Sequence, residues 1–319
     1  MMNQKTKVLV TGGTGFLAVQ TISQLLRNGY SVNTTLRDLN RKRELWENVQ
    51  ELGVAKDDRL EVFQADLTED KGWADAVKDC EYILHMASPF PQVQPEDENE
   101  LIVPARDGVL RVLKEAVLAK VKRVVLTSSF AAVGYSRKPE GYVFNETDWT
   151  DPKDENLPYI KSKTIAELTF WEFAKENPGL LEYAVVNPVG IFGPYVGKDI
   201  STSIGMIQNV IDGKIKEDPG FTFGVVDVRD VVDLHLEVML NPKAKGERFI
   251  ASSESVLSFS DIADLIKKER PNLSSLVHNL KPTHPSSYIK ISNEKAKKTF
   301  NWNPRSANEA ILATVDNIR

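Results

Sequence analysis

The sequence contains few of the residues from which disulfide frameworks and metal centres are built. It has one cysteine, Cys80, so no disulfide can form within the chain and no redox pair is available. The four histidines lack the spacing of metal ligands, and a single thiol cannot assemble a zinc site. We therefore predict no metal centre and expect structural or surface positions for His85, His235, His278 and His284.

Long apolar runs and basic clusters are missing as well. No segment approaches the ~18 consecutive apolar residues of a membrane span, and residues 1–7 lack the apolar core of a signal peptide. Lys and Arg number 40 against 45 Asp and Glu, a net charge of -5 that argues against nucleic acid or anionic membrane as a partner. We expect a cytoplasmic protein, a monomer or homodimer, that acts on a small molecule.

The composition is typical of a folded α/β protein. With 319 residues, 41% of them hydrophobic, the chain can form one large α/β unit and a smaller lobe. Short apolar segments typical of buried strands alternate with helical stretches, and we predict strands at 60–63, 82–86, 124–126 and 183–186. This alternation predicts a Rossmann-type doubly wound parallel sheet with helices on both faces.

The pattern changes after Pro194, where glycines and prolines interrupt shorter elements. We predict a dinucleotide-binding domain over residues 1–190, to which about 225–251 return, and a smaller substrate-binding lobe over 191–319. Pro104 predicts a kink or a late start in the helix at about 98–120. Ser306 and Glu309 form an S-x-x-E capping box that opens the last helix.

A glycine-rich turn, Thr11-Gly-Gly-Thr-Gly-Phe-Leu-Ala18, joins the first predicted strand to a helical pattern. Gly12 and Gly15 permit positive φ and a close approach of a ligand, and the helix N-terminus offers N–H groups to a pyrophosphate. The glycines follow G-x-x-G-x-x-A, with Ala18 at the place where only a small side chain is needed. A turn without a ligand is the alternative, but the helix and the strand at 30–36 complete a βαβ unit that favours phosphate binding.

Basic residues follow the second predicted strand and indicate which dinucleotide is bound. Arg37 and Arg41 stand where NAD-binding folds carry an acidic residue for the ribose, and guanidinium groups match a 2′-phosphate. We therefore predict NADP(H). An ordinary exposed helix start, or a ribose contact by Asp38, is the alternative. Asp66 and Leu67 follow the third strand, where an adenine edge would lie, although Asp66 could equally be a helix N-cap.

Three polar residues form the predicted catalytic group. Tyr159 and Lys163 are four residues apart and share a helix face, and the cation is expected to lower the tyrosine pKa from its usual ~10, which makes the phenol a usable general acid. Ser129 ends a buried strand with Thr127 and Ser128, and its hydroxyl could bond a substrate carbonyl oxygen. Thr127 and Ser128 could instead only satisfy backbone groups at the strand end.

Taken together, these motifs resemble the extended short-chain dehydrogenases/reductases. The resemblance is carried by T-G-x-x-G-x-x-A, the His85–Phe90 segment, Thr127-Ser-Ser129, Tyr159 with Lys163, and Asn187–Pro194. The chain is most similar to the dihydroflavonol reductase-like branch. Ala18, the segment 87–90 and Asp227-Val-Arg-Asp-Val231 particularly resemble the yeast-type methylglyoxal and aldehyde (carbonyl) reductases.

The resemblance implies roles for individual residues. The catalytic residues are Ser129, Tyr159 and Lys163, with Lys163 also bonding the nicotinamide ribose. The residues implied to bind the cofactor are Gly12, Gly15, Phe16 and Leu17 at the pyrophosphate, Arg37 and Arg41 at the 2′-phosphate, Asp66 and Leu67 at the adenine, Ala87, Ser88 and Thr127 along the cofactor, and Pro188 and Val189 at the nicotinamide. One departure is Gly134, which stands where flavonoid reductases carry a substrate-gripping asparagine.

The sequence thus predicts NADPH-dependent reduction of an aldehyde or ketone, with Tyr159 as the proton donor. A nucleotide-sugar epimerase or dehydratase of the same fold and a non-catalytic NADP-binding sensor are the alternatives. A Ser/His/Asp hydrolase is not expected, because no G-x-S-x-G elbow is present. Seven apolar residues could line a substrate pocket or belong only to the core: Met86, Phe90, Phe130, Phe192, Tyr195, Phe221 and Phe223.

Overall fold

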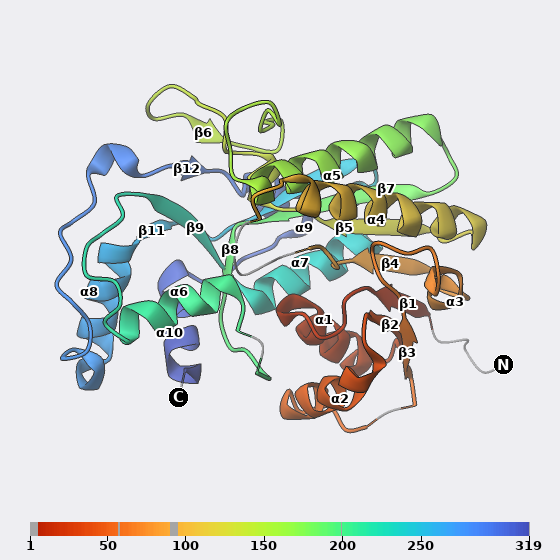
Figure 1. Ribbon diagram of the computed structural model, residues 1–319, viewed down its shortest axis with the longest axis horizontal. Helices are drawn as coiled ribbons and strands as arrows, with labels where there is room; N and C mark the ends of the chain where they lie inside the picture. The colour runs from red at the N-terminus through yellow and green to blue at the C-terminus, as the bar shows by residue number, and fades with distance from the viewer. Residues whose placement is uncertain (1–5, 57, 90–94, 199, 319) are drawn as a thin grey trace.

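The computed structural model describes residues 6–56, 58–89, 95–198 and 200–318. Its larger part is an α/β unit in which strands and helices alternate (Figure 1). The elements of this unit are β1 (Lys7–Val10), α1 (Phe16–Arg27), β2 (Ser31–Leu36), η1 (Leu39–Arg41), α2 (Lys42–Glu51), β3 (Leu60–Gln64), α3 (Trp73–Val77), β4 (Tyr82–His85), α4 (Asn99–Leu118), β5 (Arg123–Thr127), η2 (Phe130–Ala132), α5 (Pro158–Glu176), β7 (Glu182–Pro188), α7 (Val228–Leu240), η3 (Pro242–Ala244) and β10 (Glu247–Ala251).

The central sheet has seven strands in the order β10-β7-β5-β4-β1-β2-β3, and every pair is parallel. The chain builds outward from β1 to β3 and then returns to the other side of β1 with β4. This reversal is the switch point at which doubly wound sheets bind ligands beyond the carboxyl ends of their strands. The predicted doubly wound parallel sheet is confirmed.

Helices cover both faces of the sheet, and each face has its own hydrophobic core. In β1 the side chains alternate, so Val8 and Val10 enter the core under α1, α2 and α7, whereas Leu9 enters the core under α3, α4 and α5. Figure 1 shows α4 and α5 side by side on one face of the sheet. Burial on both faces explains why the strands read as continuous apolar runs.

A smaller lobe is built around a second sheet of three strands in the order β11-β9-β8 (Figure 1). Its apolar core lies between this sheet and three helices, α6, α8 and α10. A short two-stranded pairing of β6 with β12 lies apart from both larger sheets. The remaining elements are β6 (Val143–Phe144), β8 (Gly190–Phe192), α6 (Thr202–Ile211), β9 (Thr222–Asp227), β11 (Val256–Ser258), α8 (Phe259–Glu269), η4 (Pro271–Leu273), η5 (Pro285–Ser287), β12 (Lys290–Ile291), α9 (Glu294–Phe300) and α10 (Ala307–Asn317).

Several local predictions can be compared directly with these elements. The four strands expected at 60–63, 82–86, 124–126 and 183–186 are present as β3, β4, β5 and β7. Helix α10 opens with the predicted capping box of Ser306 and Glu309. The expected late start at Pro104 is wrong, because α4 begins at Asn99 and continues through the proline. Pro104 removes one backbone N–H donor from inside the helix, and the other helical hydrogen bonds of this 20-residue element outweigh that loss.

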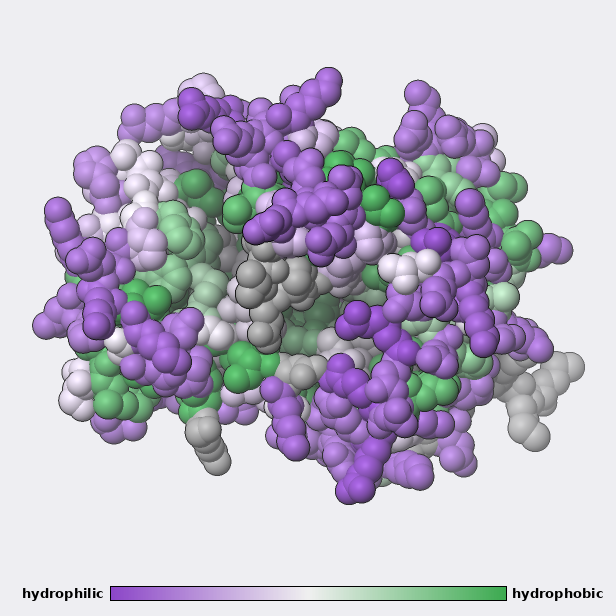
Figure 2. All heavy atoms as spheres, viewed as in Figure 1, coloured by the Kyte–Doolittle hydropathy of each residue, from purple (hydrophilic) through white to green (hydrophobic). Residues whose placement is uncertain are grey.

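The domain boundaries stay a prediction, but the path of the chain bears on them. After entering the smaller lobe, the chain returns through α7, which packs on α1 and β7, and then adds β10 beside β7 at the edge of the large sheet. Hydrophilic residues cover most of the face drawn in Figure 2, with hydrophobic residues scattered among them and in the central hollow. Among the described residues, no helix combines the length and apolarity that crossing a membrane requires.

Candidate active site

The glycine turn after β1 is shaped by two glycines that act differently. Gly12 has φ +76°, and a Cβ on it would lie 3.2 Å from Ala87 Cα, so this position needs glycine for conformation and for space. Gly15 was also expected to use positive φ, but it has φ -68° in the extended region. Gly15 instead packs closely on the turn, where a Cβ would lie 3.2 Å from the Gly12 carbonyl oxygen.

Helix α1 begins at Phe16 with N–H groups suited to an anion. The N-cap residue is Gly15, which provides no side-chain acceptor for the N–H groups of the first turn, including those of Phe16 and Leu17. Together with the positive end of the helix dipole, these groups form an anion-binding end at the edge of the sheet. Ala18 is buried at the third motif position, as its small size predicted.

The loop after β4 is tied to the glycine turn by Thr11. Its hydroxyl oxygen accepts the backbone N–H of Met86 at 3.0 Å and that of Ala87 at 2.9 Å, and it lies 2.9 Å from His85 Nδ1. Because the oxygen accepts two N–H groups, the hydroxyl proton is directed to His85. The predicted cofactor residue Ala87 is therefore held against Gly12, and Ser88 follows it in the chain.

The basic segment after β2 places its two arginines in different environments. Arg37 is exposed at the carboxyl end of the strand. Arg41 is half-buried and donates from Nε and Nη2 to both carboxylate oxygens of Glu44, at 2.8 and 2.6 Å. Asp38, the alternative ribose ligand, accepts the backbone N–H of Asn40 at 2.9 Å and so caps the start of η1.

Asp66 does not cap a helix, because α3 begins later, at Trp73 behind Gly72. Its Oδ1 accepts from the N–H and the hydroxyl of Thr68, at 2.8 and 2.7 Å. Burial opposes its ionisation, but the Thr68 bonds and the charges of Arg37 and Arg111 lower the pKa of Asp66 overall. Asp66 thus stays charged close to Arg37. Leu67 follows it, half-buried, and a Cβ on Gly108 would lie 2.6 Å from the Leu67 side chain.

Ser129 and Tyr159 come together beyond the end of β5. The Ser129 side chain accepts the backbone N–H of Ala131 at 3.1 Å, and it is hydrogen-bonded to the Tyr159 phenol. Tyr159 is the second residue of α5, whose first residue is Pro158, a favoured residue at that position. The two hydroxyls predicted to act on one carbonyl oxygen are therefore neighbours.

The electrostatics of Tyr159 differ from the prediction. Burial raises the pKa of Tyr159 to about 12, the Ser129 hydrogen bond lowers it only in part, and Tyr135 raises it further. The expected net lowering of the Tyr159 pKa is therefore wrong, because burial outweighs any effect of the Lys163 charge. Lys163 Nζ instead donates to the Thr127 carbonyl oxygen at 3.5 Å, and burial lowers the pKa of Lys163 to about 8 against the opposing charge of Glu167.

The other two hydroxyls at the end of β5 are bound to protein groups. Thr127 Oγ1 lies 2.8 Å from His235 Nε2 on α7, and His235 Nδ1 lies 2.8 Å from the Val231 carbonyl oxygen. His235 therefore donates from Nδ1 and accepts the Thr127 hydroxyl. The Ser128 hydroxyl donates to the buried Glu167 carboxylate at 2.5 Å. Of the predicted cofactor residues, Thr127 thus directs its side chain to a helix of the protein.

The end of β7 and the predicted Asp227–Val231 motif meet where the two lobes join. Pro188 ends β7, and Val189 donates its backbone N–H to the Ala251 carbonyl oxygen at 3.1 Å. Asp227 caps α7 and holds the Arg229 guanidinium at 2.7 and 2.8 Å. Asp230 accepts the Arg305 backbone N–H at 2.7 Å. This motif therefore fixes α7 and the chain before α10.

Two cavities differ in their relation to these residues. A small one of about 10 Å³ is lined by four predicted site residues, Ala87, Ser88, Thr127 and Lys163. Its other lining residues are Ser128, Ala105, Val109, Leu126 and Ala166. A larger one of about 460 Å³ lies beside the edge strand β10 and contains no predicted site residue. Among the described residues, no group of three or more His, Cys, Asp or Glu side chains could hold a metal ion.

Most of the apolar residues suggested for a substrate pocket belong to hydrophobic cores. Phe192 stacks on Phe223 with ring centroids 6.0 Å apart. Phe221 is the exception, since it is 49% exposed although its ring lies 5.7 Å from that of Phe259. Phe130 packs edge-on against Phe144 at 5.8 Å. Tyr195 and Met86 are half-buried, and Phe90 lies outside the described residues.

The Phe130 ring fills the space that a side chain at position 134 would occupy. A Cβ on Gly134 would lie 2.2 Å from the Phe130 ring, so an asparagine at this position requires the ring to move. Tyr135, which the sequence did not single out, lies 6.4 Å from the same ring and affects the pKa of Tyr159. Tyr135 therefore lies near the Tyr159 phenol, and the Phe130 ring packs against Tyr135.

The chain matches the NAD dependent epimerase/dehydratase family over residues 8–251. It belongs to that family. Cinnamoyl-CoA reductase CAD2 of Medicago truncatula is 36% identical to it over 298 residues, which cover 91% of this chain and 89% of that protein.

Two solved structures extend the likeness over almost the whole chain. The yeast methylglyoxal/isovaleraldehyde reductase Gre2, complexed with NADPH, has a TM-score of 0.88 and 30% identity and covers 98% of both chains. Gre2 of Candida albicans in its NADPH complex has a TM-score of 0.86 and 25% identity, also with 98% of both chains covered. The comparisons confirm the predicted extended short-chain dehydrogenase/reductase family, the enzyme class of oxidoreductases acting on C=O or CH–OH groups, and the nicotinamide cofactor.

Sequence reasoning assigned no individual role to four buried polar residues near the site: Glu167, Asn187, Arg248 and Glu146. Glu167 was detectable, because it follows Tyr159 and Lys163 at the same spacing of four along α5 and so shares their helix face. Arg248 gave no such signal, since it approaches α5 only through the pairing of β10 with β7.

Proposed function

We propose that this protein reduces an aldehyde or ketone to the alcohol with NADPH. The observation that carries the proposal is the hydrogen-bonded pair of Ser129 and Tyr159, placed with Lys163 beyond the carboxyl ends of β4 and β5. Ligands bind at this edge in doubly wound sheets. The two NADPH-complexed neighbours support the cofactor.

The residues present fit a dinucleotide. Gly12 leaves a space that a Cβ would fill against Ala87, and the first turn of α1 offers N–H groups to a pyrophosphate. Phe16 and Leu17 would provide these groups, while Asp66 and Leu67 would meet the adenine, and Pro188 and Val189 the nicotinamide. When bound, NADPH supplies the hydride for the carbonyl carbon.

Arg37 would hold the 2′-phosphate that distinguishes NADPH from NADH. It is exposed at the end of β2 and carries a charge suited to two parallel bonds with a phosphate. Arg41 would contribute as well, but a phosphate that engages it must share its guanidinium with Glu44.

Tyr159 delivers the proton and Ser129 orients the substrate. Because burial raises the pKa of Tyr159 to about 12, the phenol is protonated at neutral pH and can donate from Oη to the carbonyl oxygen. The Ala131 N–H occupies one lone pair of Ser129 Oγ, which directs the hydroxyl toward the same oxygen. Lys163 follows Tyr159 by one turn of α5 and would bond the nicotinamide ribose.

The proposal is tested by measuring NADPH consumption with aliphatic, aromatic and dicarbonyl substrates, for the parent and for Tyr159→Phe. Loss of the general acid lowers kcat by about 100-fold or more, since positioned proton donors contribute about 10²–10⁴. Tyr30→Phe, remote from the site, is the matched control and keeps the parent rate. A Tyr159→Phe protein that binds NADPH and reduces a good substrate at the parent rate contradicts the assignment.

A further inference from the structure

Behind the proposed catalytic group lies a buried carboxylate that the mechanism above does not use. Glu167 has no exposed surface. Its Oε2 accepts from Ser128 Oγ at 2.5 Å and from Asn187 Nδ2 at 2.6 Å. A buried charge is costly unless it is paired and hydrogen-bonded, so this side chain is held in one place by its neighbours.

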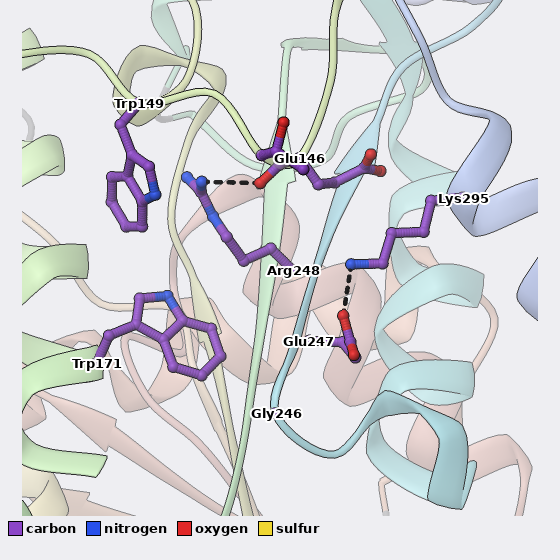
Figure 3. A pocket seen from close by; sticks show the side chains of 8 residues that line it. Glu146, Trp149, Trp171, Gly246, Glu247, Arg248 and Lys295 are labelled. Atoms are coloured by element: carbon purple, nitrogen blue, oxygen red, sulfur yellow. Dashed lines mark hydrogen bonds and ion pairs between the residues drawn. The ribbon is translucent and has the colours of Figure 1, made fainter. Parts of the chain in front are cut away.

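The other carboxylate oxygen faces the edge strand of the sheet. Arg248 Nε lies 2.6 Å from Glu167 Oε1, and Trp171 Nε1 donates to the same oxygen at 3.2 Å. The Arg248 guanidinium also stacks on Trp149, 3.7 Å from the ring centroid, and donates to the carbonyl oxygens of Glu146 and Asp148. Figure 3 shows the Arg248 guanidinium reaching toward Trp149, with Trp171 on the same side of the larger cavity.

These contacts join the two segments that carry the catalytic side chains. Glu167 is on α5, one turn after Lys163 and two turns after Tyr159. Asn187 Nδ2, which donates to Glu167, also donates to the Ser129 carbonyl oxygen at 3.1 Å. Through Ser128 and Asn187, the Glu167 carboxylate therefore connects the helix of Tyr159 to the backbone of Ser129.

We propose that Glu167 is a positioning residue, which holds the Ser128–Ser129 backbone against α5 and provides the counter-charge for the Lys163 ammonium. The proposal rests on the function proposed above. Three titratable or charged groups face this pair of Lys163 and Glu167, from other elements or from α5 itself. Lys163 is close to His85 on β4 and follows Tyr159, and Glu167 faces Arg248 on β10.

The negative charge of Glu167 raises the pKa of Lys163. Burial lowers the pKa of Lys163 to about 8, and Glu167 acts in the opposite direction. His85 is neutral at working pH, because burial and the Lys163 charge lower its pKa to about 3. Without the Glu167 charge, Arg248 and burial both act against the ammonium, so Lys163 loses its proton at lower pH.

The test compares Glu167→Gln, Glu167→Asp and the control Glu172→Gln, an exposed glutamate on the same helix. Glu167→Gln lowers kcat by about 10-fold or more while KM changes less than about threefold, because small displacements of catalytic groups affect the chemical step. In the pH–rate profile of Glu167→Gln, the alkaline limb, where activity falls as the pH rises, moves to lower pH. Glu167→Asp keeps the limb near the parent position, and Glu172→Gln matches the parent in all respects.

Glu167→Gln leaves Arg248 unpaired in the interior, which endangers folding. The double variant Glu167→Gln/Arg248→Met removes both charges and is examined alongside it. A folded single or double variant with the parent kcat and an unshifted alkaline limb overturns the proposal.

A readout without turnover separates this inference from the proposed function. In cofactor-free protein labelled with ¹³C at lysine Cε, the Lys163 resonance, assigned with Lys163→Met, titrates near pH 8 in the parent. In Glu167→Gln and in the double variant it titrates at lower pH. An unchanged Lys163 titration overturns the role of Glu167 even if carbonyl reduction is confirmed. A shifted titration supports that role even if no carbonyl substrate is reduced.

Discussion

At the scale of single residues, the site depends on what surrounds each functional group. Three consecutive hydroxyl side chains have different hydrogen-bond partners. Thr127 bonds His235 and Ser128 bonds Glu167. Ser129 bonds Tyr159. Only Ser129 faces the phenol. A hydroxyl whose partner is buried protein stabilises the strand end, whereas one beside a second hydroxyl can act on a carbonyl oxygen.

The coenzyme preference is a prediction at the residue scale. Replacing Arg37 and Arg41 by alanine removes charge-assisted bonds to the 2′-phosphate, each typically about 1.5–3 kcal/mol. We expect KM for NADPH to rise by about 10-fold or more, with NADH kinetics unchanged. Arg43→Ala is the matched control, because Arg43 lies in the same segment, 89% exposed, and pairs with Glu47. Equal losses with NADPH and NADH count against a phosphate role.

At the scale of elements, the ends of the helices position the site. Helix α1 starts at the glycine turn and ends in a Schellman motif, in which Tyr30 N–H bonds the Leu25 carbonyl and Gly29 N–H bonds that of Leu26. Gly29 has φ +88°, and this left-handed residue reverses the chain into β2. The start of α1 and the end of β2, with Arg37, thus meet at the same edge of the sheet.

Gly29→Ala tests this element directly. The conformation at Gly29 disfavours any side chain, while the space is open, with only an Arg59 atom 3.9 Å from a Cβ. We expect the free energy of unfolding to fall by about 1 kcal/mol from backbone strain alone. Gly205→Ala, inside α6 and equally uncrowded, is the control and should stabilise by about 0.5–1 kcal/mol. Denaturant titration measures the free energy of unfolding of both variants. Changes of the same sign in Gly29→Ala and Gly205→Ala would contradict this account.

At the scale of the whole molecule, burial couples stability to pH through two histidines that join distant elements. His85 links β4 to Thr11 after β1, and His235 links α7 to Thr127 at the end of β5. Burial is the main cause that lowers the pKa of His85 to about 3 and that of His235 to about 4. Both are neutral in the folded protein at neutral pH.

The sign of the pH dependence follows from linkage. An unfolded histidine takes up a proton near pH ~6.5, whereas these two remain neutral in the folded state, so the unfolded state binds more protons. The stability from neutral burial is fully present above about pH 6.5 and is lost as the pH falls through about 4 for His235 and about 3 for His85. Thermal unfolding measured from pH 7.5 to 4.5 should show it. His235→Leu with Thr127→Val should flatten this slope, and the exposed His284→Gln should not. An unaltered slope in the double variant would refute the assignment.

Particular residues show how much of the fold and of the candidate site could be predicted from the sequence. The glycine turn, the Tyr159–Lys163 spacing and the Ser306–Glu309 capping box were predictable, because each depends on residues a few positions apart. Gly12 took the expected left-handed conformation, but Gly15 did not, since the N-cap position of α1 requires extended backbone. The cellular location and the roles of the individual site residues stay predictions.

The amino-acid sequence by itself determined the alternation of strands and helices, the glycine-rich turn and the residue types of the proposed catalytic group. Only the tertiary structure decided how those groups titrate and what they contact. Burial raises the tyrosine pKa where the neighbouring lysine alone would lower it, and Glu167 meets Arg248 from 81 positions away. Local geometry follows from neighbours along the chain, whereas desolvation and charge pairing depend on residues that only folding brings together.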